Sequence, residues 1–277
     1  MAPNVLVQLQ TNGSSLSPAL ARIAAYVGAH PEDVMYQTVT ELGDRSGASE
    51  ASVIRLCRDL GFGSYAEFKM ALAIEVTKAK PTQQAHQAPD NGPIAATVRL
   101  GVSALENTEK LLDPGRIEAT VAALAQAHRI ELFGVGASAI IAQYAAYKFL
   151  RLGLNAHARE DPHLAAMMAV KLTERDVAVA VSSSGSTIDT VRAAKLAKTS
   201  GAHVVVVTNR KRSPLSKLAD TVLVAASSET PLTGGAFASK VGQLLLFEVL
   251  YGALADRDVD FERAITETAE AISDRSY

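Results

Sequence analysis

The sequence predicts two domains: an all-α helix-turn-helix domain, then an α/β domain with a doubly wound, parallel, five-stranded sheet. Three observations carry this prediction. The length, 277 residues, exceeds what one small domain needs. A Pro- and Gln-rich stretch at residues 79–93 holds no large apolar side chain. Helical spacing alone precedes that stretch, whereas short β-branched runs alternate with helical patterns after it.

The boundaries follow the change in composition. We assign residues 1–78 to the helical domain, 79–93 to a semi-extended linker and 94–277 to the α/β domain. Helical spacing covers 16–29 and 35–68, with breaks at His30-Pro31, Gly47 and residues 61–63. The predicted strands are 130–133, 154–157, 177–181, 204–208 and 221–225, and two long helices follow at 235–254 and 261–273. Strands alternating with helices indicate flavodoxin-like winding, in which ligands bind at the carboxyl ends of the strands.

Composition excludes several classes of protein. Apolar residues make up 48% and charged residues 20%, as in an ordinary globular protein. The net charge of −2 excludes a globally basic nucleic-acid coat but leaves room for a local basic patch. The single cysteine, Cys57, allows no intrachain disulfide and favours a reducing compartment. We find neither a secretory signal nor an apolar run approaching the roughly 20 residues of a membrane span, so we expect a cytoplasmic protein with no membrane contact.

Residues 38–61 have the pattern of a helix-turn-helix. Gly43 suits a close crossing of two helices, and Gly47 can take the left-handed conformation of the turn. Ser49 is a good N-cap for the second helix. On that helix four residues at helical spacing should face the core, namely Val53, Leu56, Cys57 and Leu60.

The opposite face of the second helix is predicted to bind DNA. Arginine can bond guanine bidentately, and a small side chain such as Ala51 can touch a thymine methyl. Arg45, Ser49 and Lys69 are placed to contact phosphate. The predicted DNA-binding residues are Arg45, Ser49, Ala51, Ser52, Arg55, Arg58 and Lys69. An ordinary helical bundle would show the same amphipathicity, and residues 1–80 hold seven cations against eight anions. Binding should therefore need a dimer on palindromic or paired half-sites of an operator.

Two loops of small residues, 134–138 and 182–187, follow predicted strands and open predicted helices. Both should lie at one edge of the sheet, where backbone N–H groups and hydroxyls bind an anion. The predicted ligand-binding residues are Gly136, Ala137, Ser138, Ser182, Ser183, Ser184, Gly185, Thr187 and Glu229. Residues 134–139 also fit G-x-G-x-x-A, a dinucleotide fingerprint, with Glu160 or Asp161 at a plausible distance for ribose. The second loop is no part of a dinucleotide site, so we expect a phosphorylated small molecule, no cofactor and no metal.

The second half resembles a sugar isomerase (SIS) domain, on G-x-G-x-S at 134–138, S-x-S-G-x-T at 182–187 and Leu150-Arg151-Leu152-Gly153. The first half is similar to the helix-turn-helix of the RpiR/MurR regulators, on residues 48–58, 60–62 and 68–69. The domain order is that family's, although Gly43 stands where alanine is more usual. The resemblance implies a bacterial transcription regulator that binds operator DNA and responds to a phosphorylated sugar or sugar acid.

A phosphosugar isomerase is the alternative function, and an NAD-linked sensor is a third. An isomerase needs a general base near the sugar, and the candidates are Glu229, Glu160, Asp161 and His163. No acid/base pair has diagnostic spacing, and enzymes rarely need a DNA-binding domain, so we expect no catalytic residue. The apolar segment 241–254 is a candidate interface for a homodimer or homotetramer.

Overall fold

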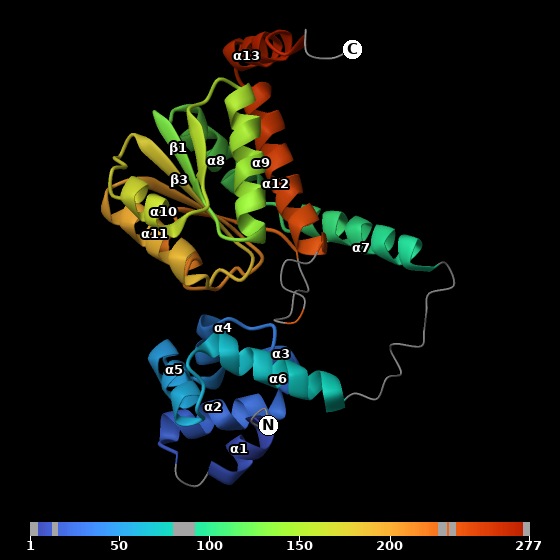
Figure 1. Ribbon diagram of the computed structural model, residues 1–277, viewed down its shortest axis with the longest axis vertical. Coiled ribbons are helices and arrows are strands. Elements are labelled where there is room, and N and C mark those ends of the chain that lie inside the picture. Colours follow the sequence, from blue (N-terminus) through green and yellow to red (C-terminus); the bar gives the residue numbers. More distant parts are fainter. Residues whose placement is uncertain (1–4, 13–15, 80–91, 227–231, 233–236, 274–277) are drawn as a thin grey trace. The chain divides into compact units, whose positions relative to one another are not determined.

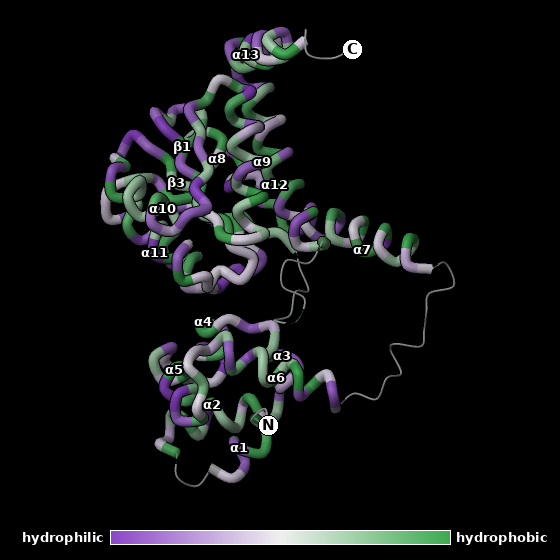
Figure 2. The backbone as a smooth tube through the Cα atoms, viewed as in Figure 1, coloured by the Kyte–Doolittle hydropathy of each residue, from purple (hydrophilic) through white to green (hydrophobic). Residues whose placement is uncertain are grey.

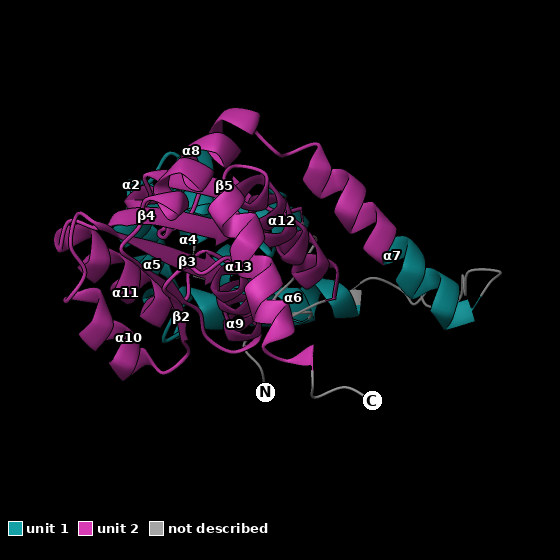
Figure 3. Ribbon diagram, turned by 90° about the horizontal axis from the view of Figure 1, so that it is seen from above, with its two compact units in different colours: residues 1–100, 228–236 teal, residues 101–227, 237–277 magenta. Residues whose placement is uncertain are grey.

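The computed structural model describes residues 5–12, 16–79, 92–226, 232 and 237–273 (Figure 1). Contacts divide the chain into two units, residues 1–100 with 228–236 and residues 101–227 with 237–277 (Figure 3). The predicted linker, 79–93, lies almost wholly outside the described residues, since α6 ends at Ala79 and α7 begins at Gly92.

The first unit is all helical. Its helices are α1 (Val5–Asn12), α2 (Pro18–Ala29), α3 (Pro31–Val34), α4 (Val39–Ser46), α5 (Glu50–Asp59) and α6 (Tyr65–Ala79). Pro18 and Pro31 stand at the first helical positions, where the missing N–H costs nothing. Helix α1 was not predicted, because its segment reads as polar. It forms because Val5 and Leu9, four residues apart, both bury into the core of this unit.

The second unit holds the sheet and its covering helices. Its elements are α8 (Pro114–Ala125), β1 (Arg129–Phe133), α9 (Ala137–Arg151), β2 (Ala156–Arg159), α10 (Pro162–Ala169), β3 (Asp176–Ser182), α11 (Ile188–Thr199), β4 (His203–Thr208), η3 (Ser216–Leu218), β5 (Thr221–Val224), α12 (Phe237–Ala255) and α13 (Val259–Glu270). Helix α7 (Gly92–Glu109) crosses the boundary between the units. All strand pairs are parallel, in the order β2-β1-β3-β4-β5, which confirms the doubly wound fold.

The sheet separates two cores, because side chains alternate along each strand. On β3, Val177, Val179 and Val181 pack toward the α8, α9 and α12 layer, whereas Ala178 and Ala180 pack toward α10 and α11. Strand order reverses between β1 and β3, so the loops after these two strands flank the switch point where α/β sheets bind ligands.

Strand β2 begins two residues later than the predicted 154–157. Leu154 is an apolar residue buried against the α9 layer, which is why the sequence pattern includes it in the strand. Pairing with β1 starts only at Ala156, opposite Ile130. Arg159 was missed as a strand residue because it is charged. Its charge is compensated within the sheet by the buried carboxylate of Glu131.

Helix α12 corrects the expectation that no segment is long and apolar enough for a membrane span. Its 19 residues pass that test by length and composition. Its inward residues, however, lie in the core of the α/β unit beside Phe149, and they are Leu246, Phe247, Leu250 and Leu254. The helix therefore packs as the core helix of a globular domain.

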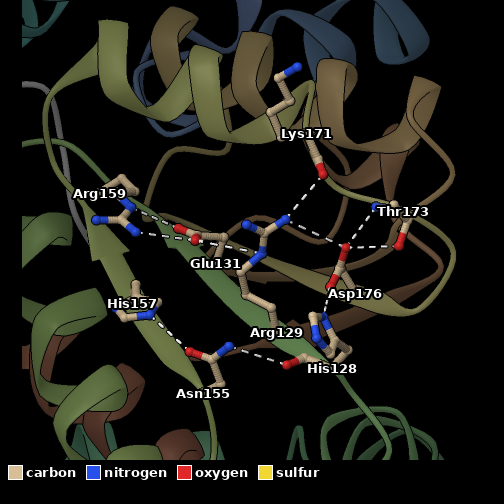
Figure 4. A network of polar contacts seen from close by, with 9 residues as sticks. All are labelled: His128, Arg129, Glu131, Asn155, His157, Arg159, Lys171, Thr173 and Asp176. Carbon is tan, nitrogen blue, oxygen red and sulfur yellow. Dashed lines mark hydrogen bonds and ion pairs between the residues drawn. The ribbon is translucent and has the colours of Figure 1, made fainter.

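A buried charged network joins β1, β2 and β3 (Figure 4). Glu131, fully buried, accepts two bonds from Arg159, at 2.8 and 3.2 Å. Asp176, 2% exposed, accepts two bonds from Thr173 and lies 3.7 Å from Arg129. Burial opposes ionisation of Asp176, but these partners outweigh it and hold the pKa of its carboxyl below the ordinary value.

Candidate functional site

The turn between α4 and α5 confirms the predicted helix-turn-helix geometry. Gly47 has φ +64°, the left-handed conformation. A side chain at Gly43 would place its Cβ 2.9 Å from the Ala48 carbonyl oxygen, so the helix crossing requires a residue without one.

Side chains cap the N-termini of both helices of the motif. Thr38 and Glu41 form a reciprocal capping box on α4. Ser49 accepts a bond from the Ser52 backbone N–H at 3.2 Å, which confirms it as the N-cap of α5. Each helix thus has a side-chain cap that bonds one N–H group of its first turn.

The two faces of α5 separate as predicted. The four residues assigned to the core are buried, namely Val53, Leu56, Cys57 and Leu60. Ala51, Arg55 and Arg58 are exposed, and hydrophilic and hydrophobic segments alternate along α5 in Figure 2. Burial raises the pKa of the Cys57 thiol to about 12, so this cysteine behaves as core filler rather than as a reactive thiolate.

The remaining predicted DNA-binding residues have different surroundings. Arg45 is exposed near the end of α4, and Ser52 is half-buried beside the α5 cap. Lys69, in contrast, donates from Nζ to the Gln37 carbonyl at 2.8 Å and lies 5.5 Å from the centre of the Tyr65 ring. Its ammonium group therefore supports the packing of α6, and a DNA contact would have to share it.

The two predicted ligand loops, residues 134–138 and 182–187, are here called the cradle. They follow β1 and β3, neighbours in the parallel sheet, so both lie at its carboxyl edge. Gly185 has φ +61°, and a Cβ there would lie 2.2 Å from Ser213 Oγ, so only glycine fits. Gly136, with φ +59°, opens α9.

The helices that start at the cradle have no side-chain cap. Gly136 has no side chain to cap α9, and the Thr187 side chain accepts no bond from the first turn of α11. In α9 the Ser138 and Ala139 N–H groups instead bond the carbonyls of Val135 and Gly136, at 3.2 and 2.9 Å. In the same unit, α8, α10 and α13 are capped by Asp113, Asp161 and Asp258. The first turn of α11 thus offers backbone N–H donors to an anion, and both helices direct the positive end of their dipole toward the cradle.

The cradle hydroxyls divide into two groups. Ser182 Oγ lies 3.1 Å from Thr187 Oγ1 and accepts from the Gly185 N–H, so it shapes the loop. Ser138 is 9% exposed and its Oγ has no hydrogen-bond partner within the described chain, whereas Ser184 is exposed and accepts from the Ser186 N–H. Ala137, half-buried, completes the first loop. Glu229 lies outside the described residues.

A polar network under the second loop was missed by the sequence analysis. Ser183 Oγ receives bonds from Lys240 Nζ at 2.5 Å and Gln243 Nε2 at 3.2 Å. Gln243 also donates to Asn209 Oδ1 at 2.9 Å. No local spacing marks these residues, because only the return of α12 to the carboxyl edge brings them to the loop.

Three of the four residues weighed as a catalytic base lie in the described part of the chain. Asp161 caps α10 through the Leu164 N–H at 2.8 Å. Glu160 accepts from Gln143 Nε2 at 3.0 Å, and His163 is exposed on the first turn of α10. Over the residues that the structure describes, no group of three or more His, Cys, Asp or Glu could hold a metal ion.

Comparison with known proteins assigns both halves. Residues 3–79 match the helix-turn-helix domain of the rpiR family, and residues 123–253 match the SIS domain. An uncharacterised HTH-type transcriptional regulator of Caldanaerobacter subterraneus is 32% identical over 98% of both chains. The HTH-type transcriptional regulator HexR of Pseudomonas aeruginosa is 31% identical over 99% of this chain and 97% of HexR.

A solved structure agrees over almost the whole length. The Vibrio vulnificus NanR protein, complexed with ManNAc-6P, superposes with a TM-score of 0.90 at 40% identity, covering 99% of this chain and 100% of NanR. The sugar phosphate is NanR's ligand.

Proposed function

Because this chain belongs to the rpiR family of HTH-type transcriptional regulators and carries a SIS domain, we propose that a phosphorylated sugar bound in the cradle controls its affinity for operator DNA. The carrying observation is that α9 and α11, neither with a side-chain cap, start from the loops after the neighbouring strands β1 and β3, at the switch point of the sheet. We also place the regulator in the cytoplasm and assign it no catalytic step.

Helix α5 supports the DNA half of the proposal. Its outward arginines, Arg55 and Arg58, are exposed, and the Arg55 side chain is 72% accessible despite an Asp59 carboxylate 3.9 Å away. Such an exposed ion pair contributes little and yields readily to a base or a phosphate. Arg45, Ser49, Ala51 and Ser52 lie on or beside this surface, so a half-site in the major groove is the expected target.

The cradle supports the ligand half. Ser138, Ser184 and Thr187 supply hydroxyls around the starts of α9 and α11, and the small residues Gly136, Ala137 and Gly185 let a ligand approach the backbone. The ManNAc-6P of NanR is a sugar phosphate of this class. Ser182 and Ser183 hold the second loop in shape from beneath.

A dimer of two chains would couple ligand binding in the cradle to DNA binding. The outer surface of α9 carries three exposed apolar side chains, Ile140, Tyr147 and Leu150, next to the half-buried apolar residues of α12. A second copy would cover this surface. Ligand in the cradle would favour one arrangement of the pair and change the spacing of two α5 helices. A coupling of about 1–3 kcal/mol changes DNA affinity roughly 5- to 150-fold.

Fluorescence anisotropy tests the proposal. The full chain is titrated at fixed salt into labelled DNA from upstream of its own and neighbouring genes, with unrelated DNA as competitor, and a panel of sugar phosphates is then added. We expect saturable binding and at least one phosphate that shifts the curve. Absence of specific binding with every ligand would refute the regulator, and turnover of a phosphosugar would then favour the isomerase.

The double variant Ser138→Ala/Ser184→Ala separates the two halves. It should lose the response to ligand and keep DNA binding, because its changes lie in the cradle alone. A normal response in this variant would show that the ligand binds elsewhere.

A further inference from the structure

A small hollow adjoins the first cradle loop on the α10 and α11 side of the sheet. Its walls include Gly134 and Val135, Arg159 and Glu160 after β2, and Asp189 and Thr190 in the first turn of α11. Its inner volume is about 10 Å³, the space of one water molecule or one hydroxyl group. The first cradle loop lines it through Gly134 and Val135, and α11, which starts directly after the second cradle loop, lines it through Asp189 and Thr190.

Thr190 indicates that this hollow receives a polar group. Its side chain lines the hollow at 2% exposure, and its Oγ1 has no hydrogen-bond partner anywhere in the described parts of the chain. A buried hydroxyl without a partner is unfavourable until a donor or acceptor reaches it. One hydroxyl group of a ligand fits both the space and the chemistry.

The rim of the hollow is acidic. Glu160 and Asp189 are exposed carboxylates at its mouth. The cation in its wall, Arg159, is held by buried Glu131 through two bonds, so its charge is already compensated. Carboxylates accept hydrogen bonds from hydroxyl or ammonium groups and repel a further carboxylate.

The other end of the same sheet edge is basic. The segment after β4, residues 208–217, contains Arg210, Lys211, Arg212 and Lys217 and no carboxylate. Lys240 reaches the second cradle loop at Ser183 Oγ. The difference in charge across the cradle gives a bound molecule a direction, with its phosphate toward the β3 and β4 loops and its other end toward the hollow.

We propose that the hollow receives a hydroxyl group from the non-phosphorylated end of the effector, and that its acidic rim rejects a carboxylate there. The effector is then a neutral sugar phosphate or an amino sugar phosphate, and not the phosphate of a sugar acid. This inference rests on the proposed function and narrows its ligand class.

Calorimetric titration of the full chain tests the ligand class. The ligands are inorganic phosphate, a hexose 6-phosphate, the matching 2-amino-2-deoxyhexose 6-phosphate and the matching aldonic acid 6-phosphate. We expect the neutral and amino ligands to bind at least tenfold more tightly than the acid. Equal or tighter binding of the acid would overturn the inference while leaving the cradle intact. Binding of none of the four would instead count against the cradle itself.

Two variants test whether the acidic rim causes the preference for the hexose phosphate over the acid. Glu160→Gln/Asp189→Asn should reduce the preference for the hexose phosphate over the acid to about threefold or less. The matched control Glu262→Gln removes an exposed carboxylate of α13 and should keep the wild-type preference. An unchanged preference in the double variant would refute the role of the rim.

Thr190→Val tests the hydroxyl itself. The unfolding temperature should not fall, because Oγ1 has no partner to lose. Affinity for the hexose phosphate should nevertheless fall about fivefold or more. An unchanged affinity would mean that the hollow holds a structural water only, and the proposal would be wrong.

Discussion

The two candidate sites prepare their helix N-termini in opposite ways. In the helix-turn-helix, Thr38 with Glu41 caps α4, and Ser49 caps α5, through side-chain hydrogen bonds. In the SIS domain, Gly136 and Thr187 leave the starts of α9 and α11 without a side-chain cap. The DNA site therefore depends on outward side chains carried by a self-sufficient helix, whereas the ligand site depends on backbone donors that the fold leaves available.

This difference teaches which substitutions should matter at each site. Changes of exposed charge should affect DNA binding and spare stability, because the α5 arginines make few internal contacts. Changes at the cradle should affect ligand binding through backbone geometry. Five predictions test this contrast, in order of decreasing effect.

Removing the outward charges of α5 should have the largest effect. Arg55→Ala/Arg58→Ala should weaken specific DNA binding about 30-fold or more, because each bidentate base contact contributes about 1–3 kcal/mol. Fluorescence anisotropy measures this at fixed salt. Lys78→Ala, which removes an exposed cation of α6, is the control and should stay near wild type. Wild-type affinity in the double variant would assign DNA recognition to another surface.

Breaking the buried network should destabilise the SIS domain alone. Asp176→Asn should cost about 3 kcal/mol in the free energy of unfolding, because Arg129 and the Thr173 N–H lose a buried carboxylate. Calorimetric unfolding should show the SIS transition falling and the helical transition unchanged. Glu267→Gln, at an exposed ion pair with Arg263, should cost under about 0.5 kcal/mol.

The same carboxylate predicts a pH dependence. The folded pKa of Asp176 is lowered, so its contribution to stability is complete above the unfolded pKa and is lost as pH falls through the lowered folded value. Wild-type stability should therefore fall more steeply in acid than that of Asp176→Asn. Parallel curves for the two proteins would contradict the assignment.

Giving α11 a side-chain cap should lower ligand affinity without lowering the free energy of unfolding. Thr187→Asp adds an acceptor at the N-cap and a charge that repels phosphate, so ligand affinity should fall about tenfold or more. The unfolding free energy should stay level or rise by up to about 1 kcal/mol. Thr187→Ser keeps the hydroxyl and should behave as wild type. Retained affinity in Thr187→Asp would remove the open first turn from the site.

Removing the α5 cap should have the smallest effect. Ser49→Ala should lower the stability of the helical unit by about 1 kcal/mol. Ser49→Asp keeps a cap but repels DNA phosphate, so it should keep stability and weaken DNA binding. If Ser49→Asp binds DNA normally, Ser49 serves the helix alone.

Local pattern was enough to predict much of the fold. The glycines at 43 and 47, the Ser49 cap and the strand at 177–181 all follow from short-range patterns, and the structure confirms them. Helix α1 escaped because two buried residues in eight give too weak a pattern. The start of β2 was misplaced because Leu154 is buried in a loop.

The candidate sites were predictable only where chemistry follows the chain. The cradle loops can be recognised by their small residues after predicted strands. Gln243 and Lys240, in contrast, reach Ser183 from a helix about 60 positions later. Arg159 and Glu131 look unsuitable for a buried sheet until each is seen to compensate the other. Lys69 reads as an exposed cation, yet it bonds the Gln37 carbonyl. Such pairings depend on tertiary contacts that sequence spacing does not encode.

The uncapped start of α11 has a consequence for the lifetime of the regulator in the cell. On the proposed function, a ligand that bonds the backbone N–H groups there binds only the folded state of the chain. At a concentration of a hundred times its dissociation constant, it stabilises the fold by about 2.7 kcal/mol. Proteases act on transiently opened chains, so opening of the SIS domain, and degradation with it, should be roughly a hundredfold rarer when effector is plentiful. The metabolite would then set how much regulator survives as well as where it binds.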